Sequence, residues 1–220
     1  MTSDLRAPLV CRFCTGNFLL PALLVATVLL GACSSIPDTD PIAGKNSANW
    51  QRHFNQVFEI NSWYARSKIA VKTVDQGFSG HLSWQQNPDN YEIDFVGPMG
   101  IGLMKISGNA QKTSLMIPDK PLYSGNSPEQ LLQNHTGYQL PVSQFYFWAR
   151  GVPNPELAFD IQLNHSSQLK RLRQLGWEIE YFNYQKYQNL MLPGKVAMKK
   201  GPIKIKRVRL NWQAIDSTNL

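Results

Sequence analysis

Short segments in which apolar and polar residues alternate recur through the chain after residue 62. In the last of them, residues 203–212, Ile203 and Ile205 alternate with lysines, while Val208 and Leu210 alternate with arginines. A period of two predicts strands with one buried face and one wet face. Turn clusters such as Asn87-Pro88-Asp89-Asn90 separate the segments, which predicts an antiparallel meander. The ten predicted strands are residues 63–72, 78–84, 91–95, 103–106, 113–117, 157–163, 169–175, 177–182, 195–199 and 203–212.

Three short helices are predicted beside these strands. Ser47 can cap the first, whose apolar face repeats at helical spacing. Ser127-Pro128-Glu129-Gln130 has the pattern of a capping box with proline at the first helical position, and this second helix ends near Gly137. Ser143 is predicted to cap a third, strongly apolar helix over residues 144–150. The apolar face of the first helix consists of Trp50, Phe54, Val57 and Phe58.

Two of these helices interrupt the run of strands, after residue 117 and before residue 157. An antiparallel sheet of about ten strands curls and must cover its apolar face, so the inserted helices are predicted to form a lid. The space between the lid and the curled sheet is then either a packed core or a cavity large enough for lipid. Composition does not distinguish these two interiors.

The N-terminal segment has the layout of a secretory signal. Arg6 and Arg12 precede a charge-free apolar run over residues 18–30, which is shorter than the roughly 20 residues of a membrane-spanning helix. The run ends in Leu30-Gly31-Ala32-Cys33, which resembles the lipobox of bacterial lipoproteins. The resemblance implies that the Cys33 thiol receives a diacylglyceryl group, that the chain is cut before Cys33, and that the new amine is acylated. Ser34 resembles the residues that permit export to the outer membrane.

These features divide the chain into four parts. Residues 1–32 are predicted to be a cleaved signal peptide, 33–47 a lipidated flexible tether, 48–215 one folded domain, and 216–220 a C-terminal tail. The only CxxC pair, Cys11 and Cys14, lies in the discarded part, so the mature chain keeps no free thiol. The chain carries a formal charge of +7. A basic surface suits anionic lipid headgroups, lipopolysaccharide or nucleic acid, or it is simply solvated, and an envelope location argues against nucleic acid.

The sequence offers little catalytic chemistry. The four histidines have no metal-ligand spacing and are interpreted as surface or turn residues, and GxSxG and phosphate-binding glycine loops are absent. Glu92 and Asp94 share one strand face and form either an acid pair or the wet face of a strand. We therefore predict a protein that is not an enzyme and has neither a cofactor nor a metal.

The positive signals are apolar. Gly97-Pro98-Met99-Gly100 lies between two predicted strands, and its Met99 either folds back onto the sheet as filler or protrudes to enter a bilayer. Six aromatic residues are candidates to line an acyl cavity, although aromatic residues at such spacing also build ordinary cores. They are Trp63, Trp84, Phe95, Phe147, Trp148 and Trp177.

Several of these segments, in this order and spacing from about Ala48 to Ala214, together resemble the LolB family of outer-membrane lipoprotein receptors. They are Leu30 to Cys33, Trp84-Gln85-Gln86, Gly97-Pro98-Met99-Gly100, Trp148-Ala149-Arg150-Gly151-Val152-Pro153 and residues 203–212. The resemblance implies an open, incomplete antiparallel barrel of about ten to eleven strands, covered by short helices. It also implies that an apolar residue matching Met99 targets the membrane, although leucine is expected at that position and a polar residue before the proline.

The resemblance further implies a monomeric receptor, lipid-anchored on the periplasmic face of the outer membrane. Such a receptor accepts lipoproteins from the periplasmic carrier LolA and places their acyl chains in the membrane without a nucleotide. The alternatives are another lipid-handling or assembly lipoprotein, such as an accessory of lipopolysaccharide transport or barrel assembly, an envelope hydrolase, or a structural anchor. A hydrolase would need a nucleophile and base that the residues do not supply.

Overall fold

The computed structural model describes residues 47–74, 77–100 and 102–216. The chain divides into two compact units, residues 1–39 and 40–220, and every described residue belongs to the second. The predicted signal peptide, Cys33 and nearly all of the predicted tether lie outside the described residues, as does most of the predicted tail.

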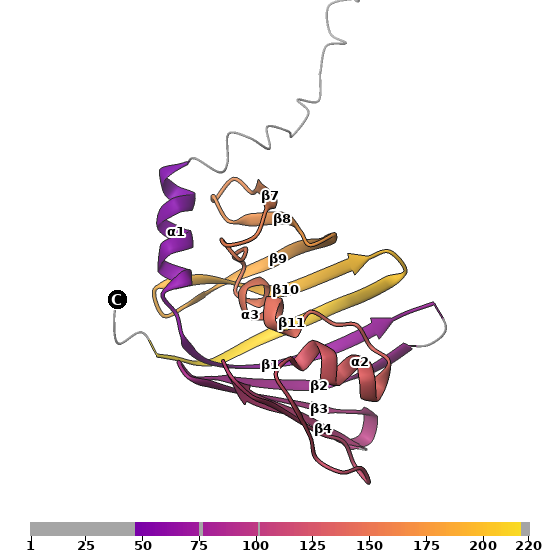
Figure 1. Cartoon of the computed structure of the whole chain (residues 1–220). Helices are drawn as coiled ribbons and strands as arrows, with labels where there is room; N and C mark the ends of the chain where they lie inside the picture. The colour runs from indigo at the N-terminus through magenta and orange to yellow at the C-terminus, as the bar shows by residue number, and fades with distance from the viewer. Residues whose placement is uncertain (1–46, 75–76, 101, 217–220) are drawn as a thin grey trace, which may run out of the picture. The chain divides into compact units, whose positions relative to one another are not determined.

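In the described residues, eleven strands form one antiparallel sheet in the order β6-β5-β4-β3-β2-β1-β11-β10-β9-β8-β7 (Figure 1). β6 and β7 are the two edges and are not paired with each other, so the barrel stays open, as predicted. Two meanders, β1 to β6 and β7 to β11, are joined where β11 pairs with β1. The strands are β1 (Ser62–Lys72), β2 (Gly77–Gln86), β3 (Asn90–Val96), β4 (Leu103–Asn109), β5 (Thr113–Met116), β6 (Tyr123–Gly125), β7 (Phe159–Leu163), β8 (Leu169–Gln174), β9 (Trp177–Tyr187), β10 (Leu190–Lys200) and β11 (Ile203–Asp216).

The predicted strands differ from the observed ones mainly in the hairpin of β9 and β10, which is longer than predicted, and at the edge strand β6, which was not predicted. β9 and β10 extend to a turn at residues 188–189, whereas the predicted strands ended at residue 182 and began again at residue 195. Pro193 is nevertheless in register with Tyr184, and a Cβ at position 194 would lie 2.5 Å from the carbonyl oxygen of Asn183. Only glycine permits that approach, so Gly194 serves the pairing instead of ending it. The three-residue strand β6 was missed because it is too short to show a period.

The three predicted helices are present as α1 (Ala48–Phe58), α2 (Pro128–Thr136) and α3 (Val142–Ala149). The Ser47 and Ser127 caps are confirmed, because each hydroxyl oxygen accepts a hydrogen bond from the backbone N–H three residues later. The predicted Ser143 cap is wrong, since Ser143 lies inside α3. Its backbone N–H instead donates to Oε1 of Glu129 at 2.7 Å, so a carboxylate from the first turn of α2 caps α3.

The inward face of the sheet is apolar, and the helices cover it. Along β1 every second side chain is buried, and the alternation continues in the neighbouring strands. Two clusters result, one around Trp63, Trp84 and Trp212 with both α2 and α3 against it, and one around Trp148, Trp177 and Ile179. α2 and α3 lie in front of the sheet in Figure 1, which confirms the predicted lid. We name the cluster around Trp63, Trp84 and Trp212 the first cluster, and the cluster around Trp148, Trp177 and Ile179 the second cluster.

The end of α3 is fixed by a buried cation. Arg150 is fully buried, and its guanidinium donates to the carbonyl oxygens of Val57, Phe58 and Ile60, where α1 ends and the chain turns into β1. Its Nε donates to the Tyr146 carbonyl at 3.0 Å, and the Tyr146 ring lies 4.0 Å from its Cζ. Burial lowers the pKa of Arg150 to about 10, so the group is charged at neutral pH. A cation thus stabilises the carboxyl end of α1.

A second polar contact fixes the same helix end to the sheet. Gln174 of β8 is buried, and its Oε1 accepts from Nε1 of Trp148 at 2.8 Å and from the backbone N–H of Asn154 at 3.0 Å. Its Nε2 donates to the Asn154 carbonyl at 2.8 Å. The last turn of α3 and the loop after it are therefore held by hydrogen bonds that no solvent competes for.

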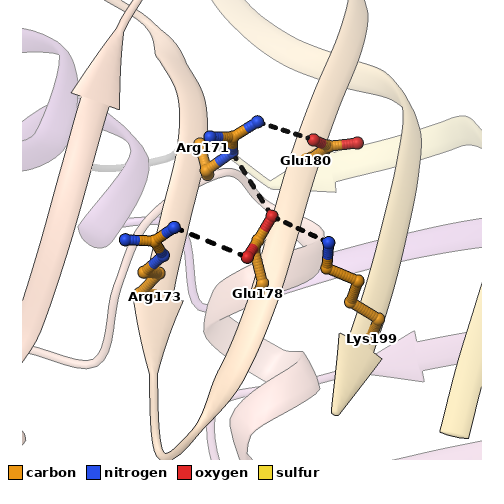
Figure 2. A network of polar contacts seen from close by, with 5 residues as sticks. All are labelled: Arg171, Arg173, Glu178, Glu180 and Lys199. Carbon is orange, nitrogen blue, oxygen red and sulfur yellow. Dashed lines mark hydrogen bonds and ion pairs between the residues drawn. The ribbon is translucent and has the colours of Figure 1, made fainter. Parts of the chain in front are cut away.

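The outward face of β8 to β10 carries ion pairs (Figure 2). Glu178 lies 3.1 Å from Nζ of Lys199 and within 3.7 Å of both Arg171 and Arg173, and Glu180 accepts from Arg171 at 3.0 Å. The hydrogen bond from Lys199 lowers the pKa of Glu178 below its ordinary value. These side chains are partly exposed, so the face is solvated and its ion pairs contribute little to stability.

We expect Arg150→Met to lower the free energy of unfolding by about 3 kcal/mol, because it removes the buried hydrogen bonds to the carbonyls of Val57 and Ile60. Urea unfolding of the mature chain measures the loss. Arg66→Met is the matched control, since exposed Arg66 bonds only the Tyr64 hydroxyl among the contacts described, and it should change stability by less than about 0.5 kcal/mol. Equal losses in the two variants would contradict the anchoring role.

We expect Glu178→Gln to cost less than about 1 kcal/mol at neutral pH. Because the folded-state pKa is lowered, the carboxylate stabilises the fold above its ordinary pKa, and that stabilisation is lost as the pH falls through the folded value. Denaturation midpoints across the acid range should therefore converge for the variant and the parent. Glu156→Gln, which removes an exposed carboxylate outside this network, is the control for loss of one negative charge.

Candidate functional site

The site is a pocket of about 620 Å³ at one end of the sheet, where the starts of α2 and α3 approach β2, β3 and β4. Its apolar part includes Trp84, Tyr91, Val142 and Tyr146, and asparagine, aspartate and glutamine side chains surround these. A concave pocket of this size with an apolar lining and a few polar groups fits a small ligand or part of a larger one. The lining residues are Trp84, Gln86, Pro88, Asp89, Asn90, Tyr91, Asn109, Ala110, Gln111, Thr113, Asn126, Pro128, Val142, Ser143 and Tyr146.

Two polar contacts shape this lining. The Tyr91 hydroxyl lies 3.0 Å from Oγ1 of Thr113, and Nε1 of Trp84 donates to Oε1 of Gln86 at 3.2 Å. Burial raises the pKa of Tyr91, so its phenol stays neutral. Trp84 and Tyr91 thus offer uncharged rings whose polar atoms already have partners, which suits an apolar part of a ligand.

The pocket is continuous with the first cluster. The ring centroid of Trp63 lies 5.1 Å from that of Trp84, 5.3 Å from that of Trp212 and 6.5 Å from that of Tyr146. Nε1 of Trp63 is buried and has no hydrogen-bond partner among the described residues. A continuous row of packed aromatic side chains therefore connects the lining of the pocket with the core under α3.

The structure separates the six predicted cavity aromatics into two environments. Trp84 lines the pocket, and Trp63 lies directly behind it in the first cluster. Trp148 and Trp177 are almost fully buried in the second cluster, where half-buried Phe95 also packs. Half-buried Phe147 packs against both clusters, as do Phe54, Leu82, Leu140, Phe145 and Leu210. The interior under the helices is thus occupied by side chains, and the pocket lies beside this packed interior, at one end of the sheet.

The tip that follows β3 presents its methionine to solvent. Met99 is 97% exposed and has a positive φ of 58°, within a short 3-10 turn over Pro98–Gly100. The Gly100 N–H donates to the Gly97 carbonyl at 3.3 Å, and the Gly97 N–H donates to the Gly102 carbonyl at 3.4 Å. Of the two interpretations of Met99, the structure contradicts the one in which it folds back onto the sheet. A left-handed backbone and an apolar side chain in water both carry a cost, which is typical of a functional position.

Sequence reasoning missed the residues that hold the lid. Arg150 lies in a motif that carried the family resemblance, but its partners are carbonyls 90 to 93 residues earlier in the chain. His53 was predicted to be a surface histidine, yet it is half-buried between Trp50 and Tyr184, and burial lowers its pKa. Its place three residues after Trp50 on a helix was the available signal.

Glu92 and Asp94 face Lys105, whose Nζ lies 2.8 Å from the first carboxylate and 3.5 Å from the second. They form ion pairs on the side of β3 opposite to buried Ile93, as the wet-face interpretation predicts. Among the residues that the structure describes, no group of three or more His, Cys, Asp or Glu is placed to hold a metal. None of the described helices is long and apolar enough to cross a membrane.

Comparison with known proteins identifies relatives over most of the chain. The family model described as outer membrane lipoprotein LolB matches residues 61–213. The outer-membrane lipoprotein LolB of Stutzerimonas stutzeri is 31% identical over 198 residues, which are 90% of this chain and 95% of that protein. The LolB of Pseudomonas paraeruginosa is 32% identical over 189 residues, covering 86% of this chain and 92% of that protein.

Among solved structures, a DUF1329 family protein from Desulfovibrio piger superposes with a TM-score of 0.51. It is 8% identical in sequence, and the match covers 83% of this chain and 95% of that chain, so it shows a shared fold alone. The family match spans β1 to β11, which includes the pocket, the tip and the lid helices. The chain belongs to the LolB family of outer-membrane lipoproteins.

Proposed function

We propose that this outer-membrane lipoprotein is a receptor that accepts lipoproteins from a LolA-type periplasmic carrier and passes their acyl chains to the outer membrane. The observation that carries the proposal is the pocket of about 620 Å³, whose lining residue Trp84 is in ring contact with Trp63 of the packed core. Acyl chains need a concave apolar surface without reactive groups. Transfer then runs by affinity differences, since an acceptor stronger by about 1.4 kcal/mol is favoured tenfold.

The anchor in this proposal is Cys33, with residues 1–32 removed as a signal peptide and 33–47 serving as the tether. The domain of residues 48–215 then acts as a monomer on the periplasmic face. Each buried CH₂ group of a lipid anchor contributes about 0.8 kcal/mol, so two or three acyl chains hold the domain firmly. Because the anchor supplies the attachment, the domain itself needs only weak and reversible contacts with lipid.

The contacts of the lid support entry beside α2. The last turn of α3 is fixed by Arg150 and by the bond between Trp148 and Gln174, whereas its first turn is capped by Glu129 of α2. Moving α2 and the first turn of α3 away from the sheet breaks fewer buried hydrogen bonds than moving the other end. In our proposal this movement exposes Trp84 and then Trp63 to an incoming chain.

The exit in this proposal is the tip Gly97-Pro98-Met99-Gly100. Transfer of one apolar side chain of this size from water into lipid contributes about 1.5–3 kcal/mol, which gives reversible contact and no permanent insertion. Methionine in place of the leucine expected at this position keeps the apolar, flexible character that such a contact requires.

We expect Met99→Glu to leave lipoprotein uptake from the carrier unchanged and to reduce delivery into phospholipid vesicles to the background rate, because a carboxylate does not enter the bilayer. The two steps are measured separately with a labelled lipoprotein bound to a LolA-type carrier. Met99→Leu is the matched control and should deliver like the parent. Undiminished delivery by Met99→Glu would remove the tip from the mechanism.

We expect Ser143→Trp to weaken acyl-chain binding by about tenfold, because the indole occupies the pocket beside Tyr146. Ser143 uses its backbone N–H for the bond with Glu129, so the helix cap survives the substitution. Ser166→Trp, at an exposed serine of the turn between β7 and β8, is the control and should bind normally. Equal binding by both variants would place the acyl chain elsewhere.

A further inference from the structure

The two ends of the sheet differ in chemistry. Neighbouring strands are antiparallel, so β1, β3, β5, β8 and β10 all finish at the same end, toward which the arrowheads of β1 and β10 point in Figure 1. The described residues of the turns that follow these strands, together with the adjoining strand residues, form what we name the rim; the turn residues are 73–74, 97–100, 102, 117–122, 175–176 and 201–202. The tip with Met99 is one part of this rim.

Exposed apolar side chains concentrate at the rim. Of the eight large apolar side chains that are exposed in the described residues, six lie there. Met99 is 97% exposed, Val74 after β1 is 73% exposed, and Leu122 after β5 is 66% exposed. The six are Val74, Met99, Leu103, Met116, Leu122 and Leu175. Apolar residues scattered singly need no explanation, but their collection at one end indicates an interaction site.

The opposite end supplies an internal comparison. Its strand-to-strand turns are residues 87–89, 110–112, 164–168 and 188–189. None of these turns contains Leu, Ile, Val, Met, Phe, Tyr or Trp. The same fold therefore builds polar turns at one end and apolar turns at the other, so exposure of turns in general does not account for the rim.

Lysines lie among the apolar side chains of the rim. Lys72, Lys120, Lys200 and Lys204 are exposed there, while Asp119 is an exposed acid of the same region. Lys72 of β1 and Lys204 of β11 lie directly opposite each other in the paired strands. Like charges directly opposite each other destabilise a sheet, and an anionic surface laid against them removes that repulsion.

We propose that the whole rim, and not the Met99 tip alone, is a docking surface for anionic phospholipid, with lysines at the headgroups and Val74, Met99 and Leu122 reaching the acyl region. This inference rests on the proposed function, because it places the domain at work on a membrane. Cationic side chains near an anionic lipid surface each strengthen binding, and apolar neighbours add the part that salt does not screen.

Docking by the rim sets the orientation of the domain on the membrane. The pocket is lined by Pro88, Asp89, Ala110 and Gln111 from turns of the opposite end. With the rim against the membrane, this pocket faces the periplasm, where a carrier arrives. Ser47 lies fourteen positions after Cys33, and an extended chain of that length reaches at most about 50 Å, which leaves room for this orientation.

The test uses the mature lipidated protein reconstituted in vesicles of phosphatidylcholine, with or without phosphatidylglycerol. Cys11 and Cys14 lie in the proposed signal peptide and Cys33 is the proposed lipidation site, so an introduced cysteine is the one thiol to label. A fluorophore is attached in Leu122→Cys at the rim and in Asn189→Cys at the opposite end. Quenching by a lipid-borne quencher reports contact with the bilayer, and Val74→Cys repeats the rim measurement at a second site.

We expect quenching of the label at positions 122 and 74, stronger with phosphatidylglycerol, and none at position 189. Lys72→Gln and Lys204→Gln should each lower the ratio of docked to undocked domain by about fivefold in anionic vesicles and leave it unchanged in phosphatidylcholine. Absence of quenching at 122 and 74, or equal quenching at 189, overturns the inference. Lysine variants that dock like the parent in anionic vesicles overturn it too.

The receptor function is measured independently, as uptake from the carrier and delivery to vesicles. If the rim labels stay unquenched while Met99→Glu still blocks delivery, the rim inference fails and the proposed function stands with the tip alone. If the rim docks but no lipoprotein is taken from a carrier, the proposed function fails and the lipid-binding surface remains.

Discussion

The pairing of β1 with β11 is the contact on which the rest of this structure depends. Each meander alone is a sheet of five or six strands with an apolar face that nothing in it can cover. Joining the first strand to the last merges two such faces into one inward surface, with Trp63 on β1 and Trp212 on β11 in direct ring contact. The two edges remain apart, so the surface has to be covered by helices instead of by closure of the barrel.

The two ends of α3 are attached to the rest of the fold by different contacts. Arg150 and Gln174 fix the end of α3 with buried hydrogen bonds, which are costly to break because no water replaces them. The start of α3 is held by the carboxylate of Glu129, by a partly buried hydrogen bond from the Asn154 amide to Oε1 of Gln144 at 3.2 Å, and by apolar contacts. In the proposed function, acyl chains enter at the end of the lid that is held by fewer buried hydrogen bonds, and the pocket lies at that end.

The same sheet also separates two surfaces. In an antiparallel sheet the turns lie at the two ends of the strands. One end can therefore be polar and the other apolar without any change in the core. The proposed acyl pocket borders the polar end, and the proposed lipid contact is at the apolar and basic end. Together, the two proposals place the uptake of cargo at one end of the sheet and its release at the other.

The sequence by itself determined the class of fold, because alternation in segments such as residues 203–212 is a local property of strands, and the Ser47 and Ser127 caps involve neighbours in the chain. It also indicated the apolar tip, although the exposure of Met99 became visible only in the structure. Tertiary structure alone decided the cap of α3, the partners of Arg150, the persistence of β10 through Pro193, and which aromatic residues border the pocket. Each of these depends on contacts between residues far apart in the chain, whose distances are set by strand register and helix packing and leave no periodic trace in the sequence.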